Sequence, residues 1–385
     1  MKKYYESDSV KYIGVDDREI DLFESQYIVP EGMAYNSYVI LDDKIAVMDT
    51  VDAVKTDEWL EKLAKELNGK TPDYLVCLHT EPDHSGSIGA LIEAYPDIKV
   101  VGNAKTFTIL GQFLDIYLED RKVVVKEGDI LDLGTHKIQF IMAPMVHWPE
   151  VMFGFEQSEG LLFAADAFGK FGALDADEDW DCEARRYYFN IVGKYGVQVQ
   201  SVLKKAAALD IKAILSLHGP ALQGDLSHYL KQYDTWSSYK PEDEGVLVAH
   251  ASIHGNTAEA ATILAEKLAA KGVKVAVTDL TRDDLAEAVE DAFRYDRLVL
   301  AAASYDGGVF LPMENFLVKL KSKNFQNRKV AILENGSWAP SAAKTIKGYL
   351  EKFKNIDLVE NVVTIKSSVK EEDLDKIDQL VSELV

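Results

Sequence analysis

Cysteine is scarce in this sequence. Its 385 residues include two cysteines, Cys77 and Cys182. Rubredoxin-type sites and iron–sulfur clusters need about four thiolates, so this chain cannot hold one of them by itself. Cys77 lies in the apolar stretch YLVCL and is expected to be a buried thiol, and a disulfide is not expected in a reducing compartment.

Long apolar runs and positive charge are also lacking. The chain has no run of about eighteen apolar residues, so no membrane-spanning helix is expected. The stretch MKKYYESDSVKY has no apolar segment after its lysines, which argues against a signal peptide and makes the cytoplasm the expected location. Lys and Arg number 42 against 64 Asp and Glu, for a net charge of −22. Nucleic-acid binding needs clustered positive charge, so neither a nucleic acid nor a membrane is an expected partner.

The sequence does contain enough apolar material for more than one core. Apolar residues make up 47% of the chain, and its length suggests two or three domains. The character of the sequence changes near residue 240, where the polar stretch WSSYKPEDEG at 236–245 is typical of a linker. We therefore predict one domain over residues 1–240 and a second over residues 241–385.

The second domain is predicted to be α/β, with a doubly wound parallel sheet. Apolar strands such as GVLVAHAS and RLVLAAASY alternate with helical segments such as NTAEAATILAEKLAAKG. Five strand–helix pairs in about 140 residues fit the five-stranded flavodoxin-like order better than a six-stranded dinucleotide fold. The first domain mixes a predicted hairpin at Asp42–Asp43 with further strands and helices, which indicates an α+β domain with helices outside a sheet core.

The stretch LHTEPDHSG at 78–86 concentrates side chains that bind metals or carry protons. It contains two histidines and two carboxylates in close succession, namely His79, Glu81, Asp83 and His84. A glutamate at 81, between two histidines, is unusual in a pattern that often binds zinc. The stretch follows the apolar segment YLVC, which places it at the end of a predicted strand.

Three more polar residues stand at the ends of predicted apolar strands. His147 follows FIMAPMV, Asp166 ends LLFAAD and His218 follows AILSL. Strand ends on one rim of a sheet can converge on a single site, so we predict that these residues join the cluster at 79–84. A single histidine at a strand end is more often structural than a ligand. Histidines without such a context are interpreted as structural, namely His136, His228 and His250.

The pattern HxExDH at 79–84, followed by His147, Asp166 and His218, resembles the metallo-β-lactamase fold. Zinc hydrolases of that superfamily carry a histidine where this chain has Glu81, and the version with glutamate resembles the flavodiiron proteins. The resemblance covers essentially the whole chain and implies a metallo-β-lactamase-like αββα sandwich followed by a flavodoxin-like domain. Three further stretches resemble the same family: VPEGMAYNSYVI at 29–40, MVHWPE at 145–150 and LHGP at 217–220.

The resemblance implies two iron ions. A carboxylate in place of an imidazole makes a site harder and more anionic, which suits iron better than zinc. Seven ligands are also too many for one tetrahedral ion. By the family pattern, the iron nearer the flavin would be bound by His79, Glu81 and His147. The other iron would be bound by Asp83, His84 and His218, and Asp166 would bridge the two.

Two aromatic residues are candidates for the wall of the pocket, namely Tyr27 and Trp148. Core packing explains Trp148 equally well.

The loop ASIHGNTAEAA at 251–261 precedes the first helix of the second domain. Hydroxyl and backbone N–H groups at a helix N-terminus suit a phosphate dianion. The loop has no Lys or Arg and matches neither GxGxxG nor GxxxxGK[ST], which favours the flavodoxin mode of binding FMN over a dinucleotide or ATP. A simple helix cap is the alternative. The residues expected at the FMN phosphate are Ser252, Ile253, His254, Gly255, Asn256 and Thr257.

Two later strand ends support a flavin site. In flavodoxins the corresponding loops hold the isoalloxazine ring, and Tyr305 or Trp338 could stack on it. Both loops depart from the commonest flavodiiron versions, which are richer in Thr, Asn and Gly. The residues expected around the ring are Ser304, Tyr305, Asp306, Gly307 and Gly308 in one loop, and Asn335, Gly336, Ser337, Trp338 and Ala339 in the other.

As a flavodiiron protein, the chain would be an oxidoreductase that reduces O2 to water, NO to N2O, or both, at a diiron site fed by FMN. The sequence does not separate the two gases. Because the chain has no four-cysteine site, the electron donor would be a separate protein such as a rubredoxin or a flavin reductase. The resemblance also implies a head-to-tail homodimer, or a dimer of such dimers, in which one subunit's FMN meets the other's irons.

Two other function classes stay open. A zinc hydrolase with a flavodoxin-like regulatory module would use Asp83 as a base against an ester or amide, but Glu81 argues against it. An electron carrier or sensor with a vestigial metal site is disfavoured by the complete ligand set. Metal analysis separates the classes, because a reductase should carry iron and FMN and a hydrolase zinc without flavin.

Overall fold

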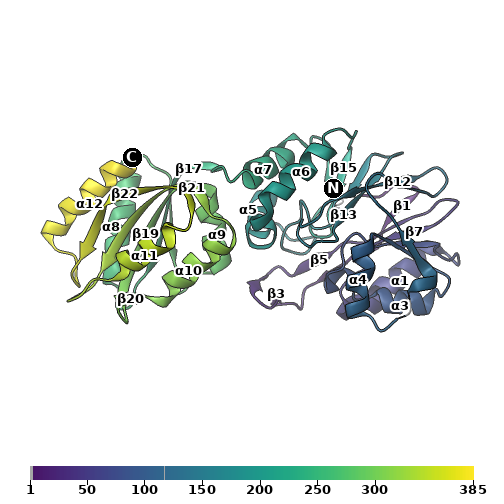
Figure 1. Ribbon diagram of the computed structural model, residues 1–385, viewed down its shortest axis with the longest axis horizontal. Coiled ribbons are helices and arrows are strands. Elements are labelled where there is room, and N and C mark those ends of the chain that lie inside the picture. The colour runs from purple at the N-terminus through teal and green to yellow at the C-terminus, as the bar shows by residue number, and fades with distance from the viewer. Residues whose placement is uncertain (1–2, 117) are drawn as a thin grey trace. The chain divides into compact units, whose positions relative to one another are not determined.

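The computed structural model describes residues 3–116 and 118–385, which form two compact units (Figure 1). The first unit is Met1–Asp234 and the second is Thr235–Val385. Among the helices of the described residues, none is long and apolar enough to cross a membrane.

The first unit is built on two mixed sheets. One has the order β1 (Val10–Tyr12), β6 (Tyr38–Ile40), β7 (Ala46–Met48), β8 (Tyr74–Val76), β9 (Lys99–Gly102) and β10 (Lys122–Val124). The other has the order β11 (Ile130–Asp132), β12 (Lys137–Met142), β13 (Met152–Glu156), β14 (Leu161–Phe163), β15 (Ala213–Leu215) and β16 (Leu222–Gln223). Two small ribbons pair β2 (Val15–Asp17) with β5 (Met33–Tyr35), and β3 (Leu22–Phe23) with β4 (Tyr27–Ile28).

The two sheets pack face to face with helices outside, as predicted from the resemblance. A Cβ added at Gly154 on β13 would lie 3.6 Å from Met48 and 3.7 Å from Leu78 of the opposite layer, so the inner faces approach closely there. The helices next to the first sheet are α1 (Thr56–Leu67), α2 (Pro82–Ser85), α3 (Ile88–Ala94) and α4 (Ala104–Phe113), and those next to the second are α5 (Trp180–Tyr187), α6 (Gly196–Ala206) and α7 (Ser227–Ser237) (Figure 1).

Local sequence explains why these elements form. Helix α1 buries Trp59, Leu63 and Leu67, which recur every four residues and so share one face. It ends at Asn68, whose φ of 46° gives the left-handed conformation common after a helix. Strands β6 and β7 pair antiparallel, which confirms the hairpin predicted at Asp42–Asp43.

The second unit is a parallel sheet in the order β18 (Val275–Asp279), β17 (Asp243–Ala251), β19 (Tyr295–Tyr305), β21 (Gln326–Asn335) and β22 (Lys354–Ile365). Helices α8 (Asn256–Ala270) and α12 (Glu371–Leu384) cover one face, and α9 (Leu285–Arg294), α10 (Leu311–Ser322) and α11 (Ala342–Leu350) cover the other (Figure 1). This is the predicted flavodoxin-like order, with its switch point at the ends of β17 and β19. The sequence did not predict β20 (Gly308–Val309), which pairs antiparallel with the end of β19.

The predicted linker at 236–245 is shorter than expected. Helix α7 continues to Ser237, and β17 already begins at Asp243. Trp236 is buried, and its Nε1 donates a hydrogen bond of 2.8 Å to Glu242. The predicted bounds of the linker were wrong because polar residues dominate this stretch, whereas its aromatic side chains, Trp236 and Tyr239, are buried.

Arg328 ties this connection to the second unit. The side chain is 2% exposed, and its guanidinium donates to the carbonyl of Tyr239 at 2.8 Å and to that of Phe293. Burial lowers the pKa of Arg328 to about 10, so it stays charged at neutral pH. A buried charge satisfied by carbonyl groups holds the chain between α7 and β17 against the sheet.

We expect Arg328→Met to lower the free energy of unfolding of the second unit by about 2–3 kcal/mol, because buried carbonyls lose their donors. Urea unfolding of the full chain measures the loss. Lys321→Met, which also replaces a basic side chain with Met but at an exposed position of α10, should cost less than about 0.5 kcal/mol. Equal losses in the two variants would contradict the anchoring role of Arg328.

Candidate metal centre and cofactor pocket

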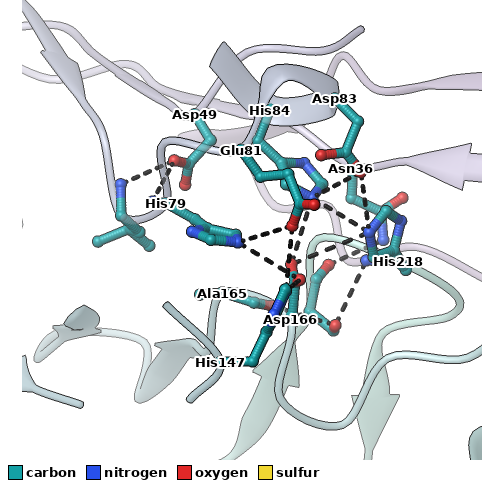
Figure 2. A network of polar contacts seen from close by, with 12 residues as sticks. Asn36, Asp49, His79, Glu81, Asp83, His84, His147, Ala165, Asp166 and His218 are labelled. Atoms are coloured by element: carbon teal, nitrogen blue, oxygen red, sulfur yellow. Dashed lines mark hydrogen bonds and ion pairs between the residues drawn. The ribbon is translucent and has the colours of Figure 1, made fainter. Parts of the chain in front are cut away.

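The predicted ligand side chains converge on one buried point in the first unit (Figure 2). Four of them lie just beyond strand ends: His79 after β8, His147 after β12, Asp166 after β14 and His218 after β15. Strand β8 belongs to one sheet and the other three belong to the second. The centre is therefore assembled from both layers of the sandwich.

The remaining ligand candidates come from the short helix α2. Glu81 is its N-cap residue, and Asp83 and His84 lie within it. Pro82 occupies the start of the helix, where its fixed φ favours the helical turn and its missing N–H leaves no bond unmade. The crowded stretch is thus one turn of helix that directs neighbouring side chains toward a common point.

One group of donors consists of His79, Glu81, His147 and Asp166. Oε2 of Glu81 lies 3.2 Å from Nε2 of His79 and 3.0 Å from Nε2 of His147. Oδ2 of Asp166 lies 3.0 Å from Nε2 of His147 and 3.6 Å from Nε2 of His79. Two imidazole nitrogens therefore face two carboxylate oxygens.

The second group consists of Asp83, His84 and His218. The Nε2 atoms of the two histidines lie 3.1 Å apart. Oδ2 of Asp83 lies 3.1 Å from Nε2 of His84 and 3.3 Å from Nε2 of His218. This spacing is close to that of donor atoms placed at about 2.1 Å around one cation.

Asp166 faces both groups. Its Oδ2 is directed at His147 and His79, whereas its Oδ1 lies 3.2 Å from Nε2 of His84 and 3.9 Å from that of His218. The geometry brings the predicted bridging residue between the two predicted sets of ligands (Figure 2).

Two groups that the sequence prediction missed hold the histidines. Oε1 of Glu150 lies 2.9 Å from Nδ1 of His79 and also accepts from the backbone N–H and hydroxyl of Thr80. The carbonyl of Ala34 lies 2.8 Å from Nδ1 of His218. Such contacts direct Nε2 of each ring toward the centre. The stretch MVHWPE contains Glu150, but nothing local indicates its partner.

Tyr187 and Asp49 complete the surroundings of the centre. The hydroxyl of Tyr187 donates to Oδ2 of Asp166 at 3.0 Å. Asp49 accepts from the backbone N–H groups of Leu78 and His79, and burial raises its pKa to about 7. Neither residue stands in a motif, so their roles depend on the tertiary fold.

The charges of the centre stabilise one another. Burial alone would lower the pKa of His84, but Asp83 and Asp166 outweigh it and raise that pKa to about 10. Burial likewise opposes the charge of His147, and Asp166 raises its pKa to about 9. Burial raises the pKa of Asp166, yet the charges of His79 and His84 hold it well below its usual range. The buried carboxylates of the centre are therefore stabilised by positive charge beside them.

The residues present fit two cations. Both carboxylate oxygens of Asp83 and Oδ1 of Asp166 are buried without a hydrogen bond among the described residues. A metal ion would satisfy these oxygens and take over the positive charge that protonated imidazoles otherwise carry. Imidazole and carboxylate donors without a thiolate suit iron among the redox metals.

The two aromatic candidates of the pocket wall differ in their position. The ring of Trp148 lies edge-on to His79, with centroids 5.4 Å apart. Tyr27 instead packs against Phe171 and donates a hydrogen bond to the carbonyl of Asn190. Trp148 therefore borders the centre directly, and Tyr27 lies behind Phe171.

The second unit carries a pocket of about 690 Å³ at the carboxyl ends of β17, β19 and β21. This volume is within the range of small-molecule sites. Trp338, 92% exposed, and Tyr305, 48% exposed, stand at its edge. The predicted residues that line it are Ser252, Ile253, His254, Asn256, Thr257, Ser304, Tyr305, Asp306, Gly307, Asn335, Gly336, Ser337, Trp338 and Ala339.

The other two predicted residues, Gly255 and Gly308, are next to lining residues in the chain but do not line the pocket themselves. Gly255, with φ 89°, is the N-cap of α8, and its N–H donates to Oγ of Ser252 at 3.1 Å. Gly308 belongs to β20. Residues that line the pocket without having been predicted are Ala303, Ser341 and Ser367.

Several predicted contact residues are also bound to the protein itself. Oγ of Ser304 accepts from the N–H groups of Ser341 and Ala342 at the start of α11. The side chain of Asn335 pairs with the backbone of Ser367 in both directions. Ser367 follows β22, a further strand end, and the sequence analysis predicted no pocket residue there.

Comparisons with known proteins agree with both units. The family model described as ODP family beta lactamase matches residues 33–219. A putative diflavin flavoprotein A 1 from Nostoc sp. is 30% identical over 95% of this chain, which spans 63% of that protein's length. A nitric oxide reductase from Moorella thermoacetica is 28% identical, over 97% of this chain and 96% of that protein. A mutant flavo di-iron protein from Thermotoga maritima has a TM-score of 0.88 at 25% identity, covering 98% of this chain and 96% of that chain.

The chain is similar to a flavo di-iron protein over nearly its whole length. This similarity covers both the metallo-β-lactamase-like unit and the flavodoxin-like unit. The two units carry candidate sites of different chemistry, one with imidazoles and carboxylates and one with hydroxyls, glycines and aromatic rings.

We expect Glu150→Gln to weaken metal binding at the His79 side by about 10- to 100-fold, because a neutral amide no longer holds the imidazole against a negative charge. Competition with a chelator measures the affinity. Glu159→Gln removes the charge of a carboxylate bound to Tyr5 and Ser7, away from the centre, and should leave the affinity unchanged. Wild-type affinity in both variants would contradict this role of Glu150.

Gly255→Ala should weaken FMN binding by about tenfold. An L-residue at this φ of 89° is strained by about 1–2 kcal/mol, and the phosphate loop would shift to relieve it. Fluorescence titration with FMN measures the change. Gly348→Ala, inside α11 with open space around the new methyl group, is the control and should not weaken binding. A variant at 255 with intact affinity would show that the loop does not hold the phosphate.

Proposed function

We propose that this chain is a flavodiiron oxidoreductase that reduces O2 to water, NO to N2O, or both, at a diiron centre that receives electrons from FMN. The observation that carries the proposal is the position of Asp166, which directs one oxygen at each of two groups of donors. A single-metal hydrolase has no use for a second complete group. The name of the Moorella relative supports the same class of chemistry.

The proposed ligand roles follow the two groups of donors. Bound iron would supply one-electron redox chemistry and a position open to a diatomic gas. Glu81 contributes a negative oxygen where an imidazole would favour zinc. We assign His79, Glu81 and His147 to one iron, Asp83, His84 and His218 to the other, and Asp166 to both.

The protein's own groups keep water away from the ligand side chains and fix their orientation. His79, His84 and His218 are fully buried, so water does not compete for their nitrogens. Glu150 orients His79, and Tyr187 holds one oxygen of Asp166 by a hydrogen bond. Fixed ligands keep reorganisation small when the charge of a centre changes.

The FMN would occupy the pocket of the second unit. Its phosphate would lie at the start of α8, where Ser252, Asn256 and Thr257 line the pocket. Its ring would lie among the loops after β19 and β21, beside Tyr305 or Trp338. The described pocket lining contains Asp306 and neither Lys nor Arg.

Electrons would come from a separate protein such as a rubredoxin or a flavin reductase. We also propose a head-to-tail homodimer, alone or as a dimer of dimers, in which the FMN of one subunit serves the irons of its partner. A cytoplasmic location fits the small number of cysteines, which are Cys77 and Cys182.

The hydrolase alternative is disfavoured by the environment of Asp83. A general base must reach the water molecule that it activates. Oδ2 of Asp83 instead lies within 3.3 Å of two imidazole nitrogens, those of His84 and His218. Asp83 is thus placed to bind a metal rather than to accept a proton.

The decisive experiment measures turnover by the iron- and FMN-loaded protein with a reduced rubredoxin. The reaction is prepared anaerobically, and either O2 or NO is then added in a known amount. Consumption of O2 or formation of N2O, with about two irons and one FMN per chain, is the expected result. Zinc without flavin in the purified protein, or no turnover of either gas by the fully loaded protein, would overturn the proposal.

We expect Glu81→His to weaken iron retention by at least about tenfold and to depress turnover with both gases, because a harder anionic donor is lost. FMN content should stay unchanged. Metal analysis after dialysis and steady-state rates measure the two effects. Glu93→His, at an exposed position of α3, controls for the added histidine. Unchanged iron content and turnover in the variant at 81 would remove Glu81 from the ligand set.

A further inference from the structure

The two halves of the metal centre are packed against different aromatic surroundings. The ring of His218 is flanked by Phe23 at 5.4 Å, Tyr35 at 6.0 Å and Tyr187 at 5.4 Å between centroids. All three rings are buried. This half is enclosed by the interior of the first unit.

The half that contains His79 and His147 is bordered by a layer that reaches the surface. The ring of Trp148 lies edge-on to His79 at 5.4 Å and 88°, and to His147 at 6.3 Å and 75°. On the other side of Trp148, Phe113 stacks at 6.3 Å and 18°. Phe113 is the last residue of α4 and is 48% exposed. Trp148 is itself only partly buried, so these two aromatic rings form the border between the imidazoles and the surface.

Hydrogen bonds do not orient the two imidazoles equally. Glu150 binds Nδ1 of His79, as the carbonyl of Ala34 binds that of His218. Among the described residues, the contacts of His147 are made by its Nε2 and by its ring, with no partner at Nδ1. The tilt of the His147 ring is therefore set by packing, with His79 on one edge and Trp148 on another.

We propose that Trp148 is a positioning residue for His147 and that Phe113 shields the same half of the centre from water. The inference rests on the proposed function, since it assumes a centre with two metal ions. An indole beside the His147 imidazole takes the place of the Nδ1 hydrogen bond that orients His79 and His218, and its apolar face lowers the access of water and charged solutes to the ligands. An apolar diatomic gas can still pass such a wall, because it needs no hydrogen bonds.

Four variants of the full-length protein test this inference: Trp148→Leu, Trp148→Phe, Phe113→Ala and the control Trp59→Leu. Trp59 is a fully buried tryptophan of α1 outside the centre. Iron per chain after equilibrium dialysis, and the rate at which a chelator extracts iron, are measured for each variant, with FMN content as an internal check.

Trp148→Leu should weaken the retention of one of the two irons by at least about tenfold, and Trp148→Phe should restore most of it, because a ring again supports His147. Phe113→Ala should keep two irons at equilibrium but release them to the chelator about tenfold faster. Trp59→Leu should lower the thermal midpoint and change neither iron measurement.

Two results would overturn the inference alone while the proposed function stands. One is a wild-type protein with two irons whose Trp148→Leu variant retains both equally well. The other is loss of iron in Trp59→Leu to the same extent, which would reduce Trp148 to a general core residue. A wild-type protein that fails to bind a second iron would instead overturn the proposed function and this inference together.

Discussion

The structure of the first unit depends on one buried carboxylate, that of Asp166, held between four imidazole nitrogens. A buried charge costs several kcal/mol unless opposite charge and hydrogen bonds surround it. His147 and His84 contact its two oxygens, and Tyr187 donates to one of them. These partners come from both sheets and from α5. The donor groups therefore come together only when the two sheets pack against each other.

The backbone near the centre carries conformations that side chains usually avoid. Asp49, Met145 and Ala165 have positive φ values of 51°, 66° and 47°. Asp49 supports the backbone of His79, Ala165 precedes Asp166 and Met145 lies just before His147. Non-glycine residues in this region cost free energy and persist where surrounding structure enforces them. The sharp turns beyond the strand ends are what let distant residues point to one place.

The pocket of the second unit is built on a different principle. Its loops are tied to one another before any cofactor enters, through Ser304 at the start of α11 and through the pairing of Asn335 with Ser367. Loops fixed in this way lose little conformational freedom on binding. The metal centre instead contains oxygens without hydrogen bonds, so it gains stability from the ions that it binds.

The sequence by itself determined the α+β character of the first unit and the α/β character of the second, because apolar periodicity and strand ends are local features. The HxExDH spacing is also local, and it carried the resemblance that implied the metallo-β-lactamase-like sandwich and the two kinds of site. Glu81 already indicated redox chemistry rather than hydrolysis. The tertiary structure decided which donors face each other, and it revealed Glu150, Tyr187 and Ser367, whose partners are far away in the chain. It also shortened the predicted linker, since the burial of Trp236 cannot be inferred from its polar neighbours. Contacts between distant residues arise from the way that the two sheets close, and no short stretch of sequence encodes that closure.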